Sequence, residues 1–257
     1  MDLKDKVAVI SGGVSGLGRG TADMFVALGA KVALFDLNEE LGAKAVAELG
    51  DDKALFHKVN VTDEESIKAG LAAAVAKFGA VHVNVNCAGI NVAHKTMGKK
   101  GPFPQADFEK GIAVNLIGTF NMLRLSAEVM SGQEPVNEDG ERGVIINTAS
   151  IAAFEGQIGQ LAYSASKGGV VGMTLPAARD LSPYGIRVMT IAPGIIDTPM
   201  LGALPDAVRQ PLIDSVQFPK RLGQPSDFAT LARDIVQNPY LNGETIRMDG
   251  GIRMGPR

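Results

Sequence analysis

Tyr163 and Lys167 are the residues whose types and spacing point most directly to chemistry. They lie four positions apart in a stretch that is expected to be helical, so both side chains project from one face. A phenol has an unperturbed pKa of about 10 and is a poor base at neutral pH, but a close ammonium group stabilises the phenolate and lowers that pKa. Ser150 ends an expected strand, from which its hydroxyl would project into the same crevice. The three residues together predict proton transfer to or from an oxygen of a bound molecule.

A glycine-rich segment, residues 11–18, joins the first expected strand to the first expected helix. It reads Ser-Gly-Gly-Val-Ser-Gly-Leu-Gly, which fits S/T-G-x-x-x-G-x-G and not the G-x-G-x-x-G of ordinary dinucleotide folds. Glycines at such a junction permit a tight turn and a close approach of the backbone to a pyrophosphate, and the helix N-terminus adds N–H groups and partial positive charge. Taken alone, the glycines could serve only the turn. Their place between a strand and a helix favours nucleotide binding.

Asp36 closes the second expected strand, at about the distance downstream where a dinucleotide fold carries its ribose-binding carboxylate. A carboxylate there accepts hydrogen bonds from the adenosine ribose and repels a 2′-phosphate. No Arg or Lys follows in Leu37-Asn38, and Ser15 stands where a basic residue could have bound that phosphate. These features favour NAD over NADP. The alternative is an ordinary aspartate in a turn at a strand end.

The hydrophobic pattern that must position these residues alternates short β-branched runs with longer helical stretches. Strands are expected at 7–10, 31–35, 54–61, 81–85, 143–147, 186–191 and 244–248. Helices are expected at 16–28, 39–49, 63–78, 107–130 and 157–181, the third capped by Asp63 or Thr62. This alternation implies right-handed βαβ crossovers, and the apolar strands imply a sheet covered on both faces. We expect an α/β, Rossmann-type doubly wound parallel sheet of about seven strands, in one domain spanning residues 1–257.

Three segments interrupt this rhythm. Residues 94–105 and 131–142 are rich in Gly, Pro and charge, which is typical of surface loops. The stretch 197–217 follows the sixth expected strand and contains three prolines. Because ligands of doubly wound sheets bind at the carboxyl ends of strands, this stretch is predicted to be a substrate loop that could act as a lid.

Composition and charge narrow the classes of function. The formal charge is −3, with 25 basic and 28 acidic residues, so the basic face of a nucleic-acid-binding protein is not expected. No apolar run approaches the length of a membrane helix, and residues 1–6 do not resemble a signal peptide. The single cysteine, Cys87, excludes an internal disulfide or a multi-cysteine zinc site, and the three histidines lack metal-ligand spacing. We therefore expect a soluble, cytoplasmic protein without a metal centre.

With these motifs in order, the whole chain resembles the short-chain dehydrogenase/reductase family. The resemblance rests on residues 11–18, Asn86-Cys87-Ala88-Gly89, Asn115, Ser150, Tyr163 with Lys167, and Pro193-Gly194. It implies an NAD-dependent oxidoreductase that interconverts a secondary alcohol and a ketone. It also implies a homotetramer.

The resemblance assigns roles to individual residues. Tyr163 would be the general acid/base, and Lys167 would lower its pKa and bind the nicotinamide ribose. Ser150 would hold the substrate oxygen together with Tyr163, and Asn115 would anchor a water that links Lys167 to solvent. Besides Tyr163 and Lys167, the implied cofactor contacts are Gly12, Ser15, Gly16, Leu17, Gly18, Asp36, Asn60, Val61, Cys87, Ala88, Gly89, Pro193, Ile196 and Thr198. Asn60 departs from the family, which usually has Asp there; its amide oxygen can still accept from adenine, without the charge.

Residues 143–169, 187–194 and 218–223 resemble one subgroup of this family, which acts on 3-hydroxyacyl-CoA thioesters in fatty acid metabolism. A small-molecule substrate of the acyl-CoA class is therefore expected, and Lys99 and Lys100 are candidates to attract its phosphates. The rivals are a 3-oxoacyl carrier-protein reductase, against which Asp36 argues, and a hydroxysteroid dehydrogenase. A scaffold protein that binds NAD without catalysis is a rival of another class, but the catalytic positions are intact.

Overall fold

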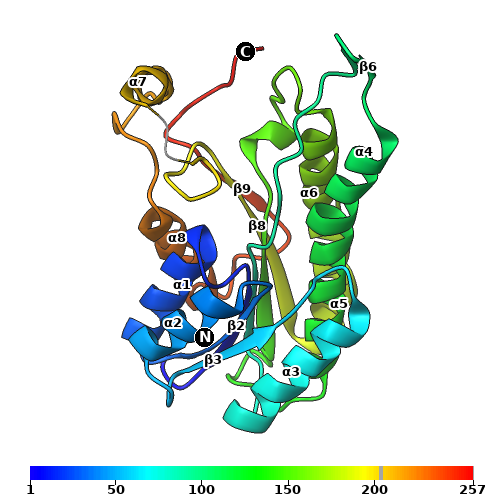
Figure 1. Ribbon diagram of the computed structural model, residues 1–257. Helices are drawn as coiled ribbons and strands as arrows, with labels where there is room; N and C mark the ends of the chain where they lie inside the picture. Colours follow the sequence, from blue (N-terminus) through cyan, green and yellow to red (C-terminus); the bar gives the residue numbers. More distant parts are fainter. Residues whose placement is uncertain (203–204, 257) are drawn as a thin grey trace.

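A seven-stranded parallel sheet forms the centre of the computed structural model, which describes residues 1–202 and 205–256 (Figure 1). Its strands lie in the order β3-β2-β1-β4-β7-β8-β9, so the chain winds outward from β1 and then outward again from β4. The bounds are β1 Val7–Ser11, β2 Lys31–Asp36, β3 Ala54–Lys58, β4 Val83–Asn86, β7 Gly143–Thr148, β8 Ile186–Pro193 and β9 Thr245–Met248. The doubly wound α/β fold predicted from the pattern is confirmed.

Helices cover both faces of this sheet. They are α1 Gly16–Ala27, α2 Glu39–Leu49, α3 Glu64–Phe78, α4 Gln105–Ile112, α5 Gly118–Ser131, α6 Leu161–Leu181, α7 Asp206–Ser215 and α8 Pro225–Gln237. Short helical segments are η1 Ala113–Ile117, η2 Ile151–Ala153 and η3 Ser182–Tyr184. Among the described residues, no helix has both the length and the apolar character that a membrane crossing requires.

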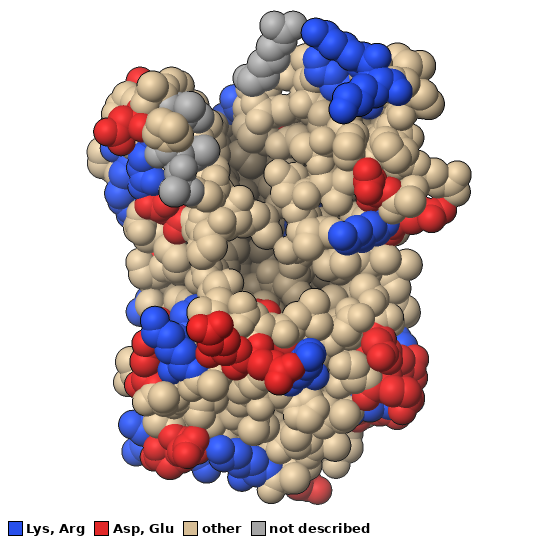
Figure 2. All heavy atoms as spheres, in the orientation of Figure 1, with Lys and Arg blue, Asp and Glu red and all other residues tan. Residues whose placement is uncertain are grey.

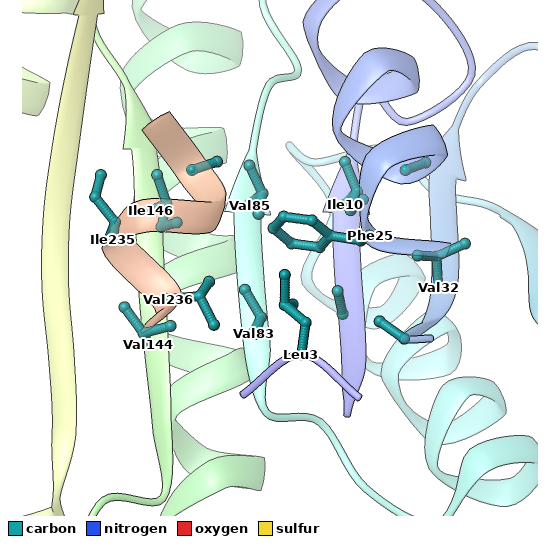
Figure 3. Close-up of a cluster of buried hydrophobic side chains, with 14 of the residues drawn as sticks. Leu3, Ile10, Phe25, Val32, Val83, Val85, Val144, Ile146, Ile235 and Val236 are labelled. Carbon is teal, nitrogen blue, oxygen red and sulfur yellow. The ribbon is translucent and has the colours of Figure 1, made fainter. Parts of the chain in front are cut away.

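The core forms two layers because successive strand residues point to opposite faces of the sheet. In β1, Ala8 and Ile10 pack with α1, α2 and α8, whereas Val9 between them packs with α3, α5 and α6. Figure 3 shows the first layer, in which Phe25 of α1 lies against the side chains of β1 and its neighbouring strands. These packed layers hold the strand ends, and the residues that follow them, in fixed positions.

Several predicted bounds differ from the structure. The third strand ends at Lys58 instead of residue 61, because the Asn60 side chain accepts from the backbone N–H of Thr62 and turns the chain. Asp63 is the cap of α3, as one of the two predicted alternatives had it. Helix α6 begins at Leu161 and not at residue 157. The loop 94–105 contains a small hairpin, β5 (Met97–Gly98) with β6 (Gly101–Pro102), and the stretch 197–217 contains α7.

The helix predicted at 107–130 is divided into three consecutive segments. The α-helix α4 continues directly into the π-helical segment η1, which continues directly into α5. Asn115 lies within η1 and is fully buried, and its carbonyl accepts a hydrogen bond from the Thr119 hydroxyl. Single π-helical turns occur frequently at functional sites. From this turn the side chain of Asn115 bonds the backbone of Ile90, in the segment that follows β4.

Candidate active site

The carboxyl ends of β4, β7 and β8 border a cavity of about 280 Å³. Figure 2 shows the surface hollowed in this region, between the segment that carries α7 and the segment that carries β5 and β6. Nine residues predicted to belong to the site line the cavity: Leu17, Cys87, Gly89, Ser150, Tyr163, Lys167, Pro193, Ile196 and Thr198. The fold therefore brings together residues that are separated by up to 181 positions, from 17 to 198.

Ser150 and Tyr163 approach each other across this cavity. Ser150 follows β7 in extended conformation and caps η2, with its hydroxyl oxygen 3.1 Å from the N–H of Ala152. Burial raises the pKa of Tyr163 above its usual value, and a side-chain hydrogen bond with Ser150 opposes that rise. The phenol is thus a proton-bearing group at neutral pH, already in contact with the serine predicted to hold the substrate oxygen.

Lys167 lies one helical turn after Tyr163 in α6, and its side chain is buried. Its ammonium nitrogen donates to the carbonyl of Thr148 at 2.7 Å and lies 5.8 Å from the centre of the Tyr163 ring. Burial lowers the pKa of Lys167 to about 8. The expected lowering of the Tyr163 pKa by Lys167 is not found in this arrangement, because the ammonium is directed at Thr148 and burial dominates the phenol.

Asn115 connects η1 to the segment that follows β4. Its side-chain oxygen accepts from the N–H of Ile90 at 2.8 Å, and its amide donates to the Ile90 carbonyl at 2.9 Å and to Ser166 at 3.2 Å. A Cβ on Gly89 would lie 3.2 Å from the Asn115 oxygen and 3.7 Å from the Lys167 nitrogen. Asn115 thus holds the chain beside Lys167, and the water predicted to join them stays a prediction.

The glycine segment forms a tight turn in which two glycines pack against backbone atoms. Gly12 has a φ of 65° and donates its N–H to the carbonyl of Phe35 at 2.8 Å, and a Cβ there would lie 2.8 Å from the backbone nitrogen of Ala88. A Cβ on Gly18 would lie 2.2 Å from the Gly12 oxygen. Ser15 precedes α1 without a side-chain cap, and the first turn holds no acidic residue. This helix N-terminus can therefore receive a pyrophosphate.

Asp36 and Asn60 lie at the ends of β2 and β3, beside the glycine segment. The Asp36 carboxylate accepts from the N–H of Asn38 at 3.1 Å. The sequence argument overlooked Lys58, which is the register partner of Asp36 in β3. Its ammonium group lies 2.5 Å from a carboxylate oxygen of Glu39, so this cation is already paired.

Asn60 uses its side-chain oxygen locally, because both the N–H and the hydroxyl of Thr62 donate to it. Val61 packs against Gly118, where a Cβ would lie 2.6 Å from its side chain. Neither residue lines the cavity, so their contacts with adenine stay predictions.

Cys87 is a half-buried residue in the lining of the cavity. The Thr148 hydroxyl donates to its sulfur at 3.6 Å, and burial raises the pKa of the thiol to about 12. The thiol is neutral at physiological pH, and a neutral thiol is a poor nucleophile. The structure places Cys87 in the lining of the cavity, and its contact with the cofactor stays a prediction.

Sequence reasoning missed several residues that line the cavity: Asn91, Gln157, Gln160, Met200, Leu201, Leu212 and Met254. Met200, Leu201 and Leu212 lie in the stretch 197–217, for which the sequence predicts a substrate loop but only Thr198 as an individual contact. Asp197 and Arg209 form an ion pair that ties α7 to the end of β8. In the described residues, no group of three or more His, Cys, Asp or Glu is placed to hold a metal ion.

Comparison with known proteins places this geometry in a family. The sequence profile described as short chain dehydrogenase matches residues 6–209, well over half of the chain. The chain belongs to this family. The resemblance noted from the motifs is therefore confirmed.

Relatives extend the match over the full length. A protein from Drosophila melanogaster named 3-hydroxyacyl-CoA dehydrogenase type-2 is 54% identical over 256 residues, which cover 99% of this chain and 100% of the relative. The Homo sapiens protein of that name is 55% identical over 256 residues, covering 99% and 97%. A crystal structure of 3-hydroxyacyl-CoA dehydrogenase type-2 from Mycobacterium avium superposes with a TM-score of 0.93 at 42% identity, covering 100% of both chains.

Proposed function

We propose that this protein is an NAD-dependent 3-hydroxyacyl-CoA dehydrogenase. The observation that carries the proposal is that Ser150, Tyr163 and the buried Lys167 line one cavity, which Leu17 of the glycine segment also lines. Full-length relatives that bear this name support the choice of substrate class. A scaffold protein that binds NAD without catalysis would not need this arrangement of polar side chains.

The residues present fit a dinucleotide. Gly12 and Gly18 permit the tight turn before α1, because a Cβ at either position would collide with backbone atoms. Ser15 precedes the helix N-terminus that would receive the pyrophosphate, and Asp36 would accept from the adenosine ribose. NAD, when bound, supplies the hydride acceptor at the nicotinamide. Among the described residues, Lys58 is the register partner of Asp36 and is paired with Glu39, which supports NAD over NADP.

The proton follows a separate path through this chain's own residues. In the direction of oxidation, Ser150 holds the substrate hydroxyl and the Tyr163 phenolate takes its proton, while the carbon gives up a hydride. The pKa of Tyr163 must fall for this step, and a cationic neighbour would lower it. Lys167, with a pKa of about 8, can supply that charge once it turns from Thr148 towards the ligand. In the direction of reduction, Tyr163 donates the proton.

An acyl-CoA requires both an apolar tunnel and a place for its phosphates. The cavity offers Ile151, Leu201 and Leu212 as apolar lining. Lys99 and Lys100 connect β5 to β6 and are exposed, and Figure 2 shows a basic cluster over this hairpin. These cations are suited to attract the phosphates of coenzyme A.

The proposal is tested by an NAD-linked activity screen that compares acetoacetyl-CoA with hydroxysteroids and short secondary alcohols. We expect the highest kcat/KM with acetoacetyl-CoA. Faster turnover of a steroid would favour the hydroxysteroid dehydrogenase alternative. Turnover of a carrier-protein thioester with NADPH in preference to NADH would favour the 3-oxoacyl carrier-protein reductase.

We also propose that the chain forms a homotetramer, as members of this family often do. The exposed faces of α5 and α6 support this, because they share a groove lined by Phe120, Met173 and Tyr184. Phe120 and Tyr184 are 45% and 51% exposed in the single chain. Light scattering behind size-exclusion chromatography measures the assembly, and a monomer at micromolar concentration would contradict the proposal.

A further inference from the structure

The segment 249–256, which follows β9, is here called the C-terminal segment. Because β9 runs parallel to β8, its carboxyl end lies at the same edge of the sheet as the cavity. Gly250 and Gly251 have φ values of 60° and 79°, which few side-chain-bearing residues adopt, and they turn the chain. Ile252 is 2% exposed and anchors the segment, and Met254 then lines the cavity.

Arg247, near the end of β9, fastens this segment to the loop between Ser150 and Tyr163. Its guanidinium donates two parallel hydrogen bonds to Glu155, at 2.7 and 2.9 Å, and a third to Asp249 at 2.8 Å. Both the Arg247 and the Glu155 side chains are about three-quarters buried, with 22% and 25% exposed. A bidentate pair of this kind fixes orientation as well as distance.

Two further bonds hold the residues that follow Met254. The side-chain amide of Gln157 donates to the Gly255 carbonyl at 3.3 Å, and the N–H of Ile158 donates to the Pro256 carbonyl at 3.0 Å. Met254 is therefore fixed on both sides, by the Arg247 network before it and by these bonds after it. These bonds hold the backbone of Met254 beside the cavity that this residue lines.

The lining of the cavity combines residues assigned to NAD with apolar side chains that have no such assignment, among them Ile151, Leu201, Leu212 and Met254. These four side chains come from three separate chain segments and line the same cavity as Ser150. Methionine is long and unbranched, so it can occupy space in the cavity that a longer acyl chain would need.

We propose that Met254 limits the length of the acyl chain that this cavity accepts, and that the Arg247–Glu155 pair positions it. This rests on the proposed function, since it takes the substrate to carry an acyl chain. Met254 is a specificity-determining residue in this proposal and takes no part in proton or hydride transfer.

The test measures kcat/KM for a series of straight-chain 3-hydroxyacyl-CoA substrates in wild type, Met254→Ala and Met254→Phe. Each methylene newly buried raises kcat/KM by about fourfold. Met254→Ala removes three side-chain atoms, so we expect the ratio of medium-chain to short-chain kcat/KM to rise at least about tenfold. Met254→Phe should lower the same ratio. Glu155→Gln removes the negative charge that pairs with Arg247. This variant should also raise the ratio of medium-chain to short-chain kcat/KM, by a smaller factor than Met254→Ala.

Met24→Ala is the matched control, because Met24 lies on α1 and does not line the cavity. Straight-chain 2-alkanols of increasing length are assayed in parallel. If wild type oxidises no acyl-CoA, the proposed function fails, and the alkanol series still tests Met254. If wild type oxidises the series but neither Met254 variant moves the length ratio beyond the Met24→Ala control, the proposal for Met254 is overturned and the proposed function stands.

Discussion

The preference for NAD over NADP should depend on three charges: Asp36 at the end of β2, Lys58 at the end of β3 and Glu39 at the start of α2. Asp36 presents a carboxylate there, and its partner in register, Lys58, is neutralised by Glu39 at 2.5 Å. We consider two substitutions that remove one negative charge each, Asp36→Asn and Glu39→Gln. The first keeps an oxygen that can accept from the N–H of Asn38, so the turn after β2 is preserved.

The size of the NAD preference follows from the hydrogen bonds between the Asp36 carboxylate and the adenosine ribose. A ribose hydroxyl bonded to a carboxylate contributes about 1.5–3 kcal/mol, and with NADP that bond is lost and like-charge repulsion is added. Since about 1.4 kcal/mol is a factor of ten, wild type should prefer NAD by at least about 100-fold in kcat/KM. Asp36→Asn should reduce the ratio to about tenfold or less. Glu39→Gln frees the exposed Lys58 ammonium, and we expect NADP turnover to improve by only about two- to fivefold.

Steady-state kinetics with both cofactors at saturating substrate decide the matter. The improvement from Glu39→Gln should disappear at high ionic strength, because salt screens exposed charges. The double variant should exceed either single variant with NADP. Wild-type activity that is equal or better with NADP would refute the reasoning, since it would mean that Asp36 does not face the 2′-position of the ribose.

Three further predictions test other parts of the structure. Tyr163→Phe should lower kcat by about 100- to 10,000-fold and leave the Kd for NAD close to wild type, because only the proton donor is lost; a kcat above a tenth of wild type would contradict the assignment. Changing Lys99 and Lys100 to Ala should raise KM for acyl-CoA but not for an uncharged alcohol, with an effect that shrinks as salt is added; an equal rise for both substrates would exclude steering by charge. His82 is largely buried, its Nδ1 accepts from the N–H of Val7, and burial lowers its pKa to about 4. The neutral imidazole contributes its full amount to the free energy of unfolding above the unfolded pKa of about 6.5. As the pH falls from there towards 4, this contribution is lost, by about 2 kcal/mol after allowance for solvent. Urea unfolding at a series of pH values measures the loss, and His82→Gln, which lacks the titrating group, is the control.

The motifs of this protein could be recognised in the sequence because each depends on local geometry. Tyr163 and Lys167 share a face as a consequence of the helical repeat alone. One tight turn requires the glycines of residues 11–18. In this turn Gly12 has a positive φ, and Gly18 packs against the carbonyl oxygen of Gly12. The alternation of apolar strands and helices likewise determines a parallel sheet, and a parallel sheet brings all strand ends to one edge.

Tertiary structure decided what lies beside those motifs. Lys58 is separated from Asp36 by 22 positions and becomes its neighbour only through strand register. Met254 reaches the cavity because β9 pairs with β8 and because Arg247 binds Glu155, 92 positions away. The ammonium of Lys167 is directed at the Thr148 carbonyl by packing that no spacing rule describes. Such contacts produce no periodic pattern in the sequence, because they form between residues that are distant in the chain and meet only once the layers have packed.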